Sequence, residues 1–120
     1  MRNTIRYHVV GLSYKNADLL IRGKFSLSKS QISLLLQQAK SDGLNELIVI
    51  STCNRTELYG IVEDPQILID YLCKFSKGTL AQFKEKGYVL SEQQAVNHVF
   101  QVGCGLDSQI IGDFEIIGQL

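Results

Sequence analysis

The chain is organised around the stretch Leu47-Ile48-Val49-Ile50-Ser51-Thr52-Cys53-Asn54-Arg55-Thr56-Glu57-Leu58-Tyr59. It begins as a run of large aliphatic residues, mostly β-branched, which is typical of a buried central strand. Polar or reactive residues then follow without a break from Ser51 to Arg55. A strand that ends in this way carries its reactive side chains at the edge of the sheet, on a rigid support. Cys53 and Arg55 are two residues apart, so in an extended backbone they would point to the same face.

Hydrophobic periodicity and turn signals predict the other elements. The expected strands are residues 5–12, 46–53, 56–62 and 88–90, and the expected helices are 16–22, 28–42, 64–77 and 91–102. Ser28 with Gln31, and Ser91 with Gln94, have the spacing of a capping box. Asp64-Pro65 offers an N-cap followed by the proline that is favoured at the first helical position.

The order of these elements predicts the class of fold. A β-α-β-β-α-β sequence followed by one more helix indicates an α+β sandwich, with one sheet and helices on one face. Residues 79–86 are polar and are expected to form a loop. Residues 110–120 are apolar and periodic and stop with no helix-ending signal, so we expect the chain to be cut from a longer one.

Composition restricts the possible classes of function. One domain, residues 1–120, is the natural interpretation of this length. Twelve basic and twelve acidic residues leave no net charge, which argues against avid, nonspecific binding of nucleic acid. Three cysteines without a CxxC pair and two widely spaced histidines predict no structural zinc site and a reducing, cytoplasmic location. No apolar run reaches the roughly 20 residues of a membrane span.

Three motifs carry a resemblance to a known family. Ser51-Thr52-Cys53-Asn54-Arg55-Thr56-Glu57-Leu58-Tyr59 resembles the signature of glutamyl-tRNA reductases, the enzymes that begin tetrapyrrole synthesis from glutamyl-tRNA. The stretch Gly105-Leu106-Asp107-Ser108-Gln109-Ile110-Ile111-Gly112-Asp113 with Gly118-Gln119 agrees, and His8-Val9-Val10-Gly11-Leu12-Ser13-Tyr14-Lys15 is a looser match. The resemblance implies the N-terminal catalytic domain of such an enzyme. It also implies a ferredoxin-like sandwich, with an antiparallel sheet and a C-terminal helical extension.

The resemblance further implies a mechanism. The thiolate of Cys53 would attack the ester carbonyl of glutamyl-tRNA and form a glutamyl thioester. NADPH would then reduce the thioester to glutamate-1-semialdehyde, on the route to 5-aminolevulinate and heme. This sequence has no glycine-rich dinucleotide fingerprint, so the NADPH site and the family's dimerisation region are expected outside it. A homodimer and the downstream glutamate-1-semialdehyde aminomutase are the expected partners, and the neutral net charge still allows docking of the end of a tRNA.

The family's site residues transfer to matching positions here. Cys53 and His98 are the expected catalytic residues, and the expected substrate-binding residues are Thr52, Asn54, Arg55, Ser108, Asp113, Phe114, Glu115 and Gln119. The α-carboxyl of the substrate is esterified, so the resemblance assigns Arg55 to the free side-chain carboxylate of the glutamate. Most members of the family have Glu-Pro-Gln where this chain has Asp113-Phe114-Glu115, which leaves the contact at Glu115 open.

Each of these assignments has a simpler alternative. Cys53 could be a small buried residue at a strand end, although its neighbours are polar. Arg55 could pair with Glu57 or another surface carboxylate, and an arginine fork also suits a bidentate grip on a carboxylate. His98 lies on an apolar helix face, where a hydrogen-bonded core histidine is common, but an imidazole can also move protons. His8 is interpreted as structural.

Two other classes of function remain open. Ferredoxin-like domains also bind small amino-acid effectors, and Arg55 and Ser108 could then hold such an effector without catalysis. A thiol-redox role is disfavoured, because no resolving cysteine is spaced near Cys53. Cys73, beside an apolar helix stripe, and Cys104, between two glycines, are expected to be inert.

Overall fold

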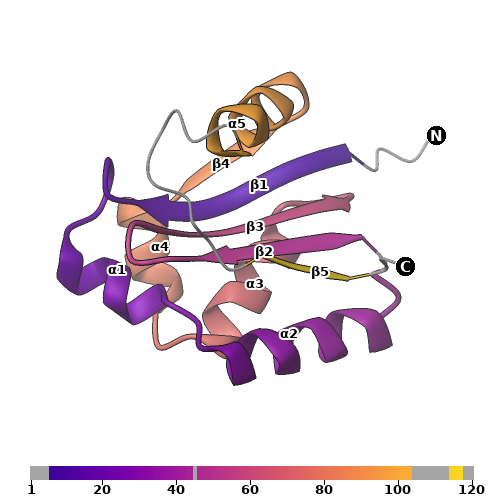
Figure 1. Ribbon diagram of the computed structural model, residues 1–120, viewed down its shortest axis with the longest axis horizontal. Coiled ribbons are helices and arrows are strands. Elements are labelled where there is room, and N and C mark those ends of the chain that lie inside the picture. Colours follow the sequence, from indigo (N-terminus) through magenta and orange to yellow (C-terminus); the bar gives the residue numbers. More distant parts are fainter. Residues whose placement is uncertain (1–5, 45, 104–113, 118–120) are drawn as a thin grey trace.

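The computed structural model describes residues 6–44, 46–103 and 114–117. Its sheet contains five strands: β1 (Arg6–Ser13), β2 (Leu47–Ser51), β3 (Arg55–Val62), β4 (Tyr88–Ser91) and β5 (Phe114–Ile117). They lie in the order β4-β1-β3-β2-β5, and every neighbouring pair is antiparallel (Figure 1). The first four strands have the arrangement of a ferredoxin-like fold, which confirms the predicted class.

The helices cover the two faces of this sheet unequally. They are α1 (Leu19–Phe25), α2 (Lys29–Ser41), α3 (Gln66–Phe75), α4 (Leu80–Lys86) and α5 (Gln93–Gly103). The first four pack on one face, and α5, the predicted C-terminal helical extension, lies on the other (Figure 1). Neighbouring residues of a strand point to opposite faces, so Leu58 joins the larger core under α1–α4 and Tyr59 joins the smaller core under α5.

Local signals fixed most of the helix starts. Ser28 and Gln31 form the predicted capping box, with Ser28 N–H donating to Gln31 Oε1 at 2.7 Å and Gln31 N–H donating to Ser28 Oγ at 3.2 Å. The carboxylate of Asp18 accepts the N–H of Ile21 at 3.0 Å and caps α1. The carboxylate of Asp64 accepts the N–H of Gln66 at 2.9 Å just before α3, whose N-cap is Pro65, so the helix begins one residue later than predicted. These caps join residues two or three apart, which is why the sequence reveals them.

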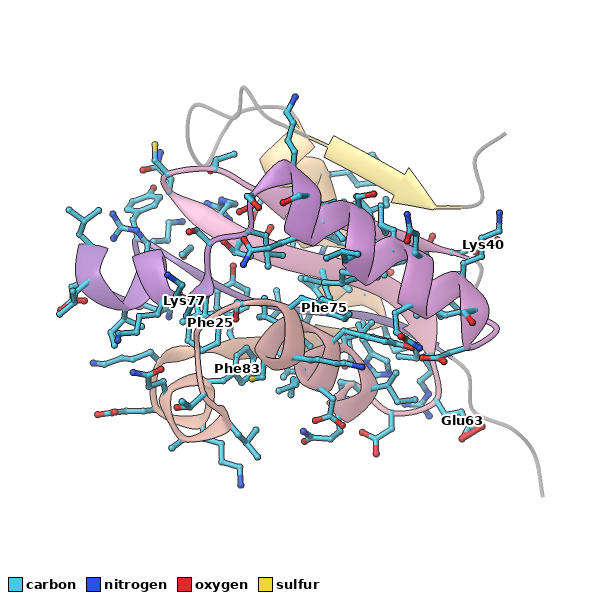
Figure 2. The ribbon with its side chains drawn as sticks, turned by 90° about the horizontal axis from the view of Figure 1, so that it is seen from below. Phe25, Lys40, Glu63, Phe75, Lys77 and Phe83 are labelled. Carbon is cyan, nitrogen blue, oxygen red and sulfur yellow. The ribbon has the colours of Figure 1, made fainter. Side chains whose placement is uncertain are left out.

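Two predictions around β4 were wrong. Residues 79–86, expected to be a loop, contain α4 with its own capping box, made by Thr79 and Gln82. Phe83 holds this helix in place, because it is buried and its ring packs edge-on to Phe25 with 6.3 Å between the ring centroids (Figure 2). The predicted capping box at Ser91 is absent: Ser91 ends β4, and its hydroxyl bonds His8 Nδ1 at 2.6 Å.

The C-terminal segment also differs from its periodic pattern. Its described part, residues 114–117, is a strand that pairs with β2, with Glu115 opposite Val49 and Phe114 opposite Ile50. Apolar residues in a short run do not distinguish helix from strand, and here pairing with the edge of β2 decides the conformation. No helix in the described part of the chain is long and apolar enough to cross a membrane.

Candidate functional site

Cys53 lies at the tip of the β2–β3 hairpin. Thr52 N–H donates to the carbonyl of Arg55 at 2.8 Å, while Thr52 Oγ1 accepts the N–H groups of Asn54 and Arg55 at 3.2 and 3.3 Å. The turn therefore has two residues at its tip, Cys53 and Asn54, and the cysteine is exposed. The strand was predicted to continue to Cys53, but β2 ends at Ser51. The argument that Cys53 and Arg55 share a face of one extended segment was therefore wrong.

Hydrogen bonds from elsewhere in the chain to backbone carbonyls hold this hairpin tip. Arg22 on α1 donates its Nε–H to the carbonyl of Cys53 at 3.3 Å and its Nη1–H to the carbonyl of Ala17 at 2.8 Å. Tyr14 N–H donates to the carbonyl of Asn54 at 2.9 Å. The tip is thus tied both to α1 and to the segment that follows β1. Sequence reasoning missed Arg22, whose role depends on contacts 31 residues away.

A buried carboxylate lies further along β3. Glu57 is fully buried and accepts hydrogen bonds from Tyr59 Oη at 2.6 Å on Oε1, and from Arg55 Nη1 at 3.2 Å on Oε2. The same Oε2 contacts His98 Nε2 at 2.6 Å and accepts the hydroxyl of Tyr88. Arg55, Glu57 and Tyr59 alternate along the strand, so all three point to the face that α5 covers.

These contacts determine the charge of Glu57. Burial alone would raise the pKa of its carboxyl, but hydrogen bonds from His98, Tyr59 and Tyr88 outweigh burial and leave this pKa below its usual value. Burial, followed by the charge of Glu57, raises the pKa of both tyrosines, which therefore remain protonated donors. An ionised carboxylate can only accept, so His98 must carry its proton on Nε2 in this contact.

The simpler alternatives for Arg55 and for His98 both correspond to contacts in the structure. Arg55 does pair with Glu57, but the pair is completely buried instead of lying on the surface. His98 is a hydrogen-bonded histidine on the inner face of α5, stacked on Tyr59 with 6.4 Å between the ring centroids and edge-on to Tyr88 at 5.8 Å. The catalytic roles of these residues stay predictions, because a structural contact neither gives nor removes them.

The structure therefore brings together only part of the predicted site. Glu57 joins Arg55 to His98 through one carboxylate oxygen, and Thr52, Cys53 and Asn54 form the adjoining turn. Ser108, Asp113 and Gln119 lie outside the described residues, and Phe114 and Glu115 are described only as backbone of β5. Sequence reasoning undervalued Glu57, and it missed Tyr59 and Tyr88. The alternating polar positions of Arg55-Glu57-Tyr59 inside a strand were the available signal.

The environments of the two described cysteines predict different reactivities. Cys73 is half-buried on α3, and burial together with the nearby charge of Asp70 raises the pKa of its thiol. Cys53 is exposed at the hairpin tip. We expect iodoacetamide to label Cys53 first in the folded protein, because alkylation requires access and thiolate. Peptide mapping after limited alkylation measures this order, and earlier labelling of Cys73 would contradict it.

Comparison with known proteins places these residues in context. A family model described as "Glutamyl-tRNAGlu reductase, N-terminal domain" matches residues 10–120. The chain is 55% identical over 114 residues to glutamyl-tRNA reductase of Flavobacterium psychrophilum, covering 95% of this chain and 28% of that protein. It is 51% identical over 120 residues to glutamyl-tRNA reductase 2 of Flavobacterium johnsoniae, covering 100% of this chain and 28% of that protein.

A solved structure shows the same fold. Glutamyl-tRNA reductase from Methanopyrus kandleri superposes with a TM-score of 0.64 at 23% identity, covering 86% of this chain and 23% of that one. At this identity the likeness bears on the fold alone. The chain thus spans little more than a quarter of the length of the curated relatives described above.

Proposed function

Since this chain belongs to the family of glutamyl-tRNAGlu reductase N-terminal domains, we propose that it supplies the substrate site and the nucleophile for the reduction of glutamyl-tRNA. The observation that carries the proposal is the exposed Cys53 on a turn that Arg22 and Tyr14 hold from outside the hairpin. A nucleophile must be reachable by a large substrate and yet fixed in position. The tip of a tight, anchored hairpin meets both requirements.

The first chemical step proposed is acyl transfer to Cys53. The thiolate attacks the ester carbonyl carbon of glutamyl-tRNA, a C–S bond forms, and the bond from that carbon to the ribose oxygen breaks. The released ribose oxygen must gain a proton. The glutamyl group remains on Cys53 as a thioester, so the difficult reduction is separated from the release of tRNA.

His98 is the proposed carrier of that proton. Its Nε2–H is engaged by Glu57, so in the neutral ring Nδ1 has the lone pair that can accept and return a proton. A carboxylate that binds one imidazole nitrogen in this way fixes the orientation of the ring, as in other acid–base pairs. Glu57 would act through His98, as a positioning residue.

Arg55 is the proposed partner of the free carboxylate of the glutamyl group. A guanidinium binds a carboxylate better than an ammonium does, because two parallel N–H groups match its two oxygens. In the structure the guanidinium is enclosed, and Glu57 holds its Nη1. The proposal therefore requires that substrate binding opens a path to Arg55. Thr52, Asn54 and the residues at positions 108, 113–115 and 119 complete the proposed substrate set.

The second half-reaction is assigned to another part of the reductase. NADPH is the family's reductant, and a dinucleotide site of the usual kind needs a parallel βαβ unit with a glycine-rich turn. All neighbouring strands in the described sheet are antiparallel, so these residues do not fit that cofactor. We therefore place the NADPH site outside this domain. By resemblance to the family, we propose the same for the homodimer contacts and any docking of the aminomutase, in a cytoplasmic enzyme.

Intact-mass analysis tests whether this domain carries out the transfer step without the reduction. We expect this chain, mixed with glutamyl-tRNA, to release tRNA slowly and to gain a glutamyl group on Cys53, or to yield glutamate by hydrolysis of the thioester. It should form no glutamate-1-semialdehyde with excess NADPH. Semialdehyde formation would show that the domain division is wrong. Reversible binding of glutamate, with no adduct and no tRNA release, would favour the non-catalytic effector module instead.

A further inference from the structure

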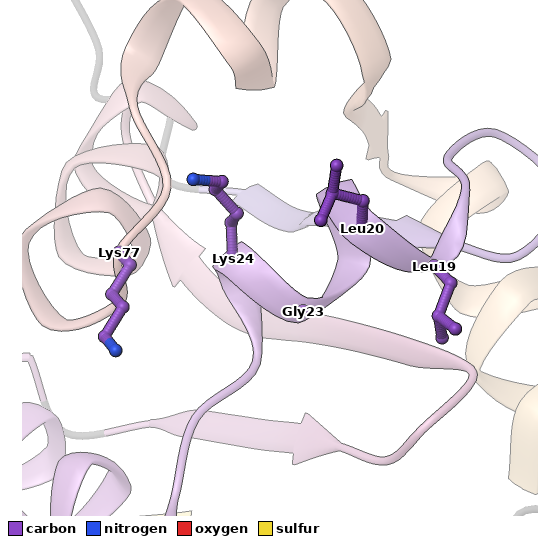
Figure 3. A pocket seen from close by; sticks show the side chains of 5 residues that line it. All are labelled: Leu19, Leu20, Gly23, Lys24 and Lys77. Atoms are coloured by element: carbon purple, nitrogen blue, oxygen red, sulfur yellow. The ribbon is translucent and has the colours of Figure 1, made fainter.

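A surface pocket lies on α1, the helix whose Arg22 contacts the carbonyl of Cys53. A pocket of about 490 Å³ is lined by Leu19, Leu20, Gly23, Lys24 and Lys77, and we refer to these residues as the α1 surface (Figure 3). Leu19 and Leu20 are 71% and 73% exposed, which is unusual for two adjacent leucines on a short helix. The lining contains two lysines and no carboxylate, so the charge of the α1 surface is positive although the whole chain is neutral.

The two lysines come from separate segments that a backbone hydrogen bond joins. Lys77, in the connection between α3 and α4, donates its N–H to the carbonyl of Lys24 at 2.9 Å. Lys24 and Lys77 lie toward one end of the pocket, and Leu20 and Leu19 lie toward the other (Figure 3). Beneath them, Phe25 is fully buried, and Gly78 leaves no room for a Cβ against its ring. The packing of Phe25 against Gly78 therefore fixes the α1 surface on the core.

The helix that carries most of this surface lies beside the proposed nucleophile. Arg22, on the same helix as Lys24, donates to the carbonyl of Cys53 at 3.3 Å. A seven-residue helix is only about 10 Å long at 1.5 Å per residue, so α1 spans a distance comparable to a few nucleotides. In the transfer step the terminal ribose must sit at Cys53, and the RNA must continue outward over a neighbouring surface. The α1 surface is such a neighbour, and its charge is opposite to that of phosphates.

We propose that the α1 surface binds the single-stranded 3′ acceptor end of the tRNA, with Lys24 and Lys77 on its phosphates and Leu19 and Leu20 against sugar or base faces. This proposal rests on the proposed function, because it names where the leaving group of that reaction docks. Contacts to phosphate position a nucleic acid without reading its sequence. Unstacked bases at the end of an RNA pack on apolar side chains, which explains exposed leucines beside the lysines.

A pair of matched double variants tests the proposal in the complete reductase. Lys24→Gln/Lys77→Gln removes the two cations of the α1 surface, and Lys40→Gln/Lys74→Gln removes two exposed cations elsewhere. Lys40 lies at the far end of the molecule from Lys77 (Figure 2), and Lys74, in the last turn of α3, does not line the pocket. Glutamyl transfer is measured with glutamyl-tRNA and with 2′(3′)-O-glutamyl-adenosine, which has the ester but no phosphates.

We expect the first variant to raise KM for glutamyl-tRNA roughly ten-fold and to leave glutamyl-adenosine unchanged. The slope of the logarithm of the tRNA association constant against the logarithm of salt concentration should become shallower by about 1.4 in this variant. Each phosphate neutralised on a single strand contributes about 0.7 to that slope. The Lys40/Lys74 variant should stay within about two-fold of wild type. An unchanged KM and slope in the Lys24/Lys77 variant, or an equal loss in the control, would overturn the proposal.

Binding of uncharged tRNA separates this proposal from the proposed function. A wild-type enzyme that acylates Cys53 from neither substrate would contradict the function. Fluorescence anisotropy with labelled uncharged tRNA would still decide about the surface, because it does not depend on transfer. Weaker binding by Lys24→Gln/Lys77→Gln than by the control supports the α1 surface, and equal dissociation constants overturn it.

Discussion

Cys53→Ala is expected to lower glutamyl transfer from glutamyl-tRNA by about 10³-fold or more. The substitution removes the atom proposed to attack the ester, and removal of a nucleophile costs several powers of ten in enzymes that form covalent intermediates. Cys53 is exposed at the tip of the hairpin, and the turn is closed by Thr52 and by backbone groups. The alanine variant should therefore keep its unfolding free energy to within about 0.5 kcal/mol.

The measurement is tRNA release followed together with the mass of the protein. Cys73→Ala is the matched control, because it removes the other described thiol from a half-buried place on α3. Cys53→Ser adds a finer test: it keeps the shape and hydrogen-bonding capacity of the side chain but offers a much poorer nucleophile at neutral pH. If Cys53→Ala retained transfer and Cys73→Ala lost it, the assignment of the nucleophile would be wrong.

Glu57→Leu is expected to destabilise the fold by about 3–5 kcal/mol. The substitution leaves Arg55 as a buried cation without its carboxylate partner, and breaking a buried pair from one side typically costs that much. The hydroxyls of Tyr59 and Tyr88 also lose their acceptor. The double variant Arg55→Met/Glu57→Leu should recover much of the loss, because replacing both members of a buried pair with apolar residues is often close to neutral.

Urea unfolding at several pH values measures these effects. The folded-state pKa of Glu57 lies below its ordinary value of 4.5. The ionised carboxylate therefore stabilises the fold fully above about pH 4.5, and this contribution is lost as the pH falls through the lowered pKa. The difference in unfolding free energy between wild type and Glu57→Leu should consequently become smaller at acidic pH. A loss under about 1 kcal/mol at pH 7, or a double variant no more stable than Glu57→Leu, would contradict the buried network.

The sequence by itself determined the class of fold and the position of the polar stretch from Ser51 to Arg55 between two neighbouring strands. Strand alternation, the Ser28 capping box and the polar run after Ile50 are all written in residues that lie within a few positions of each other. Such signals depend on the local backbone, so they are read correctly without knowing the rest of the molecule. For α4 the prediction of a loop was wrong, because the packing of Phe83 on Phe25 decided the outcome. At residues 114–117, pairing with β2 decides the strand conformation.

Only the tertiary structure decided what surrounds the candidate site. The sequence suggests Glu57 as a surface partner of Arg55, yet Glu57 is fully buried beneath α5. Tyr88 and His98, which bind it, are 31 and 41 residues away in the chain. A buried carboxylate needs several donors at once, and their convergence depends on the order of the strands and on which face α5 covers. The same reason applies to Arg22, which reaches Cys53 only because α1 packs beside the hairpin.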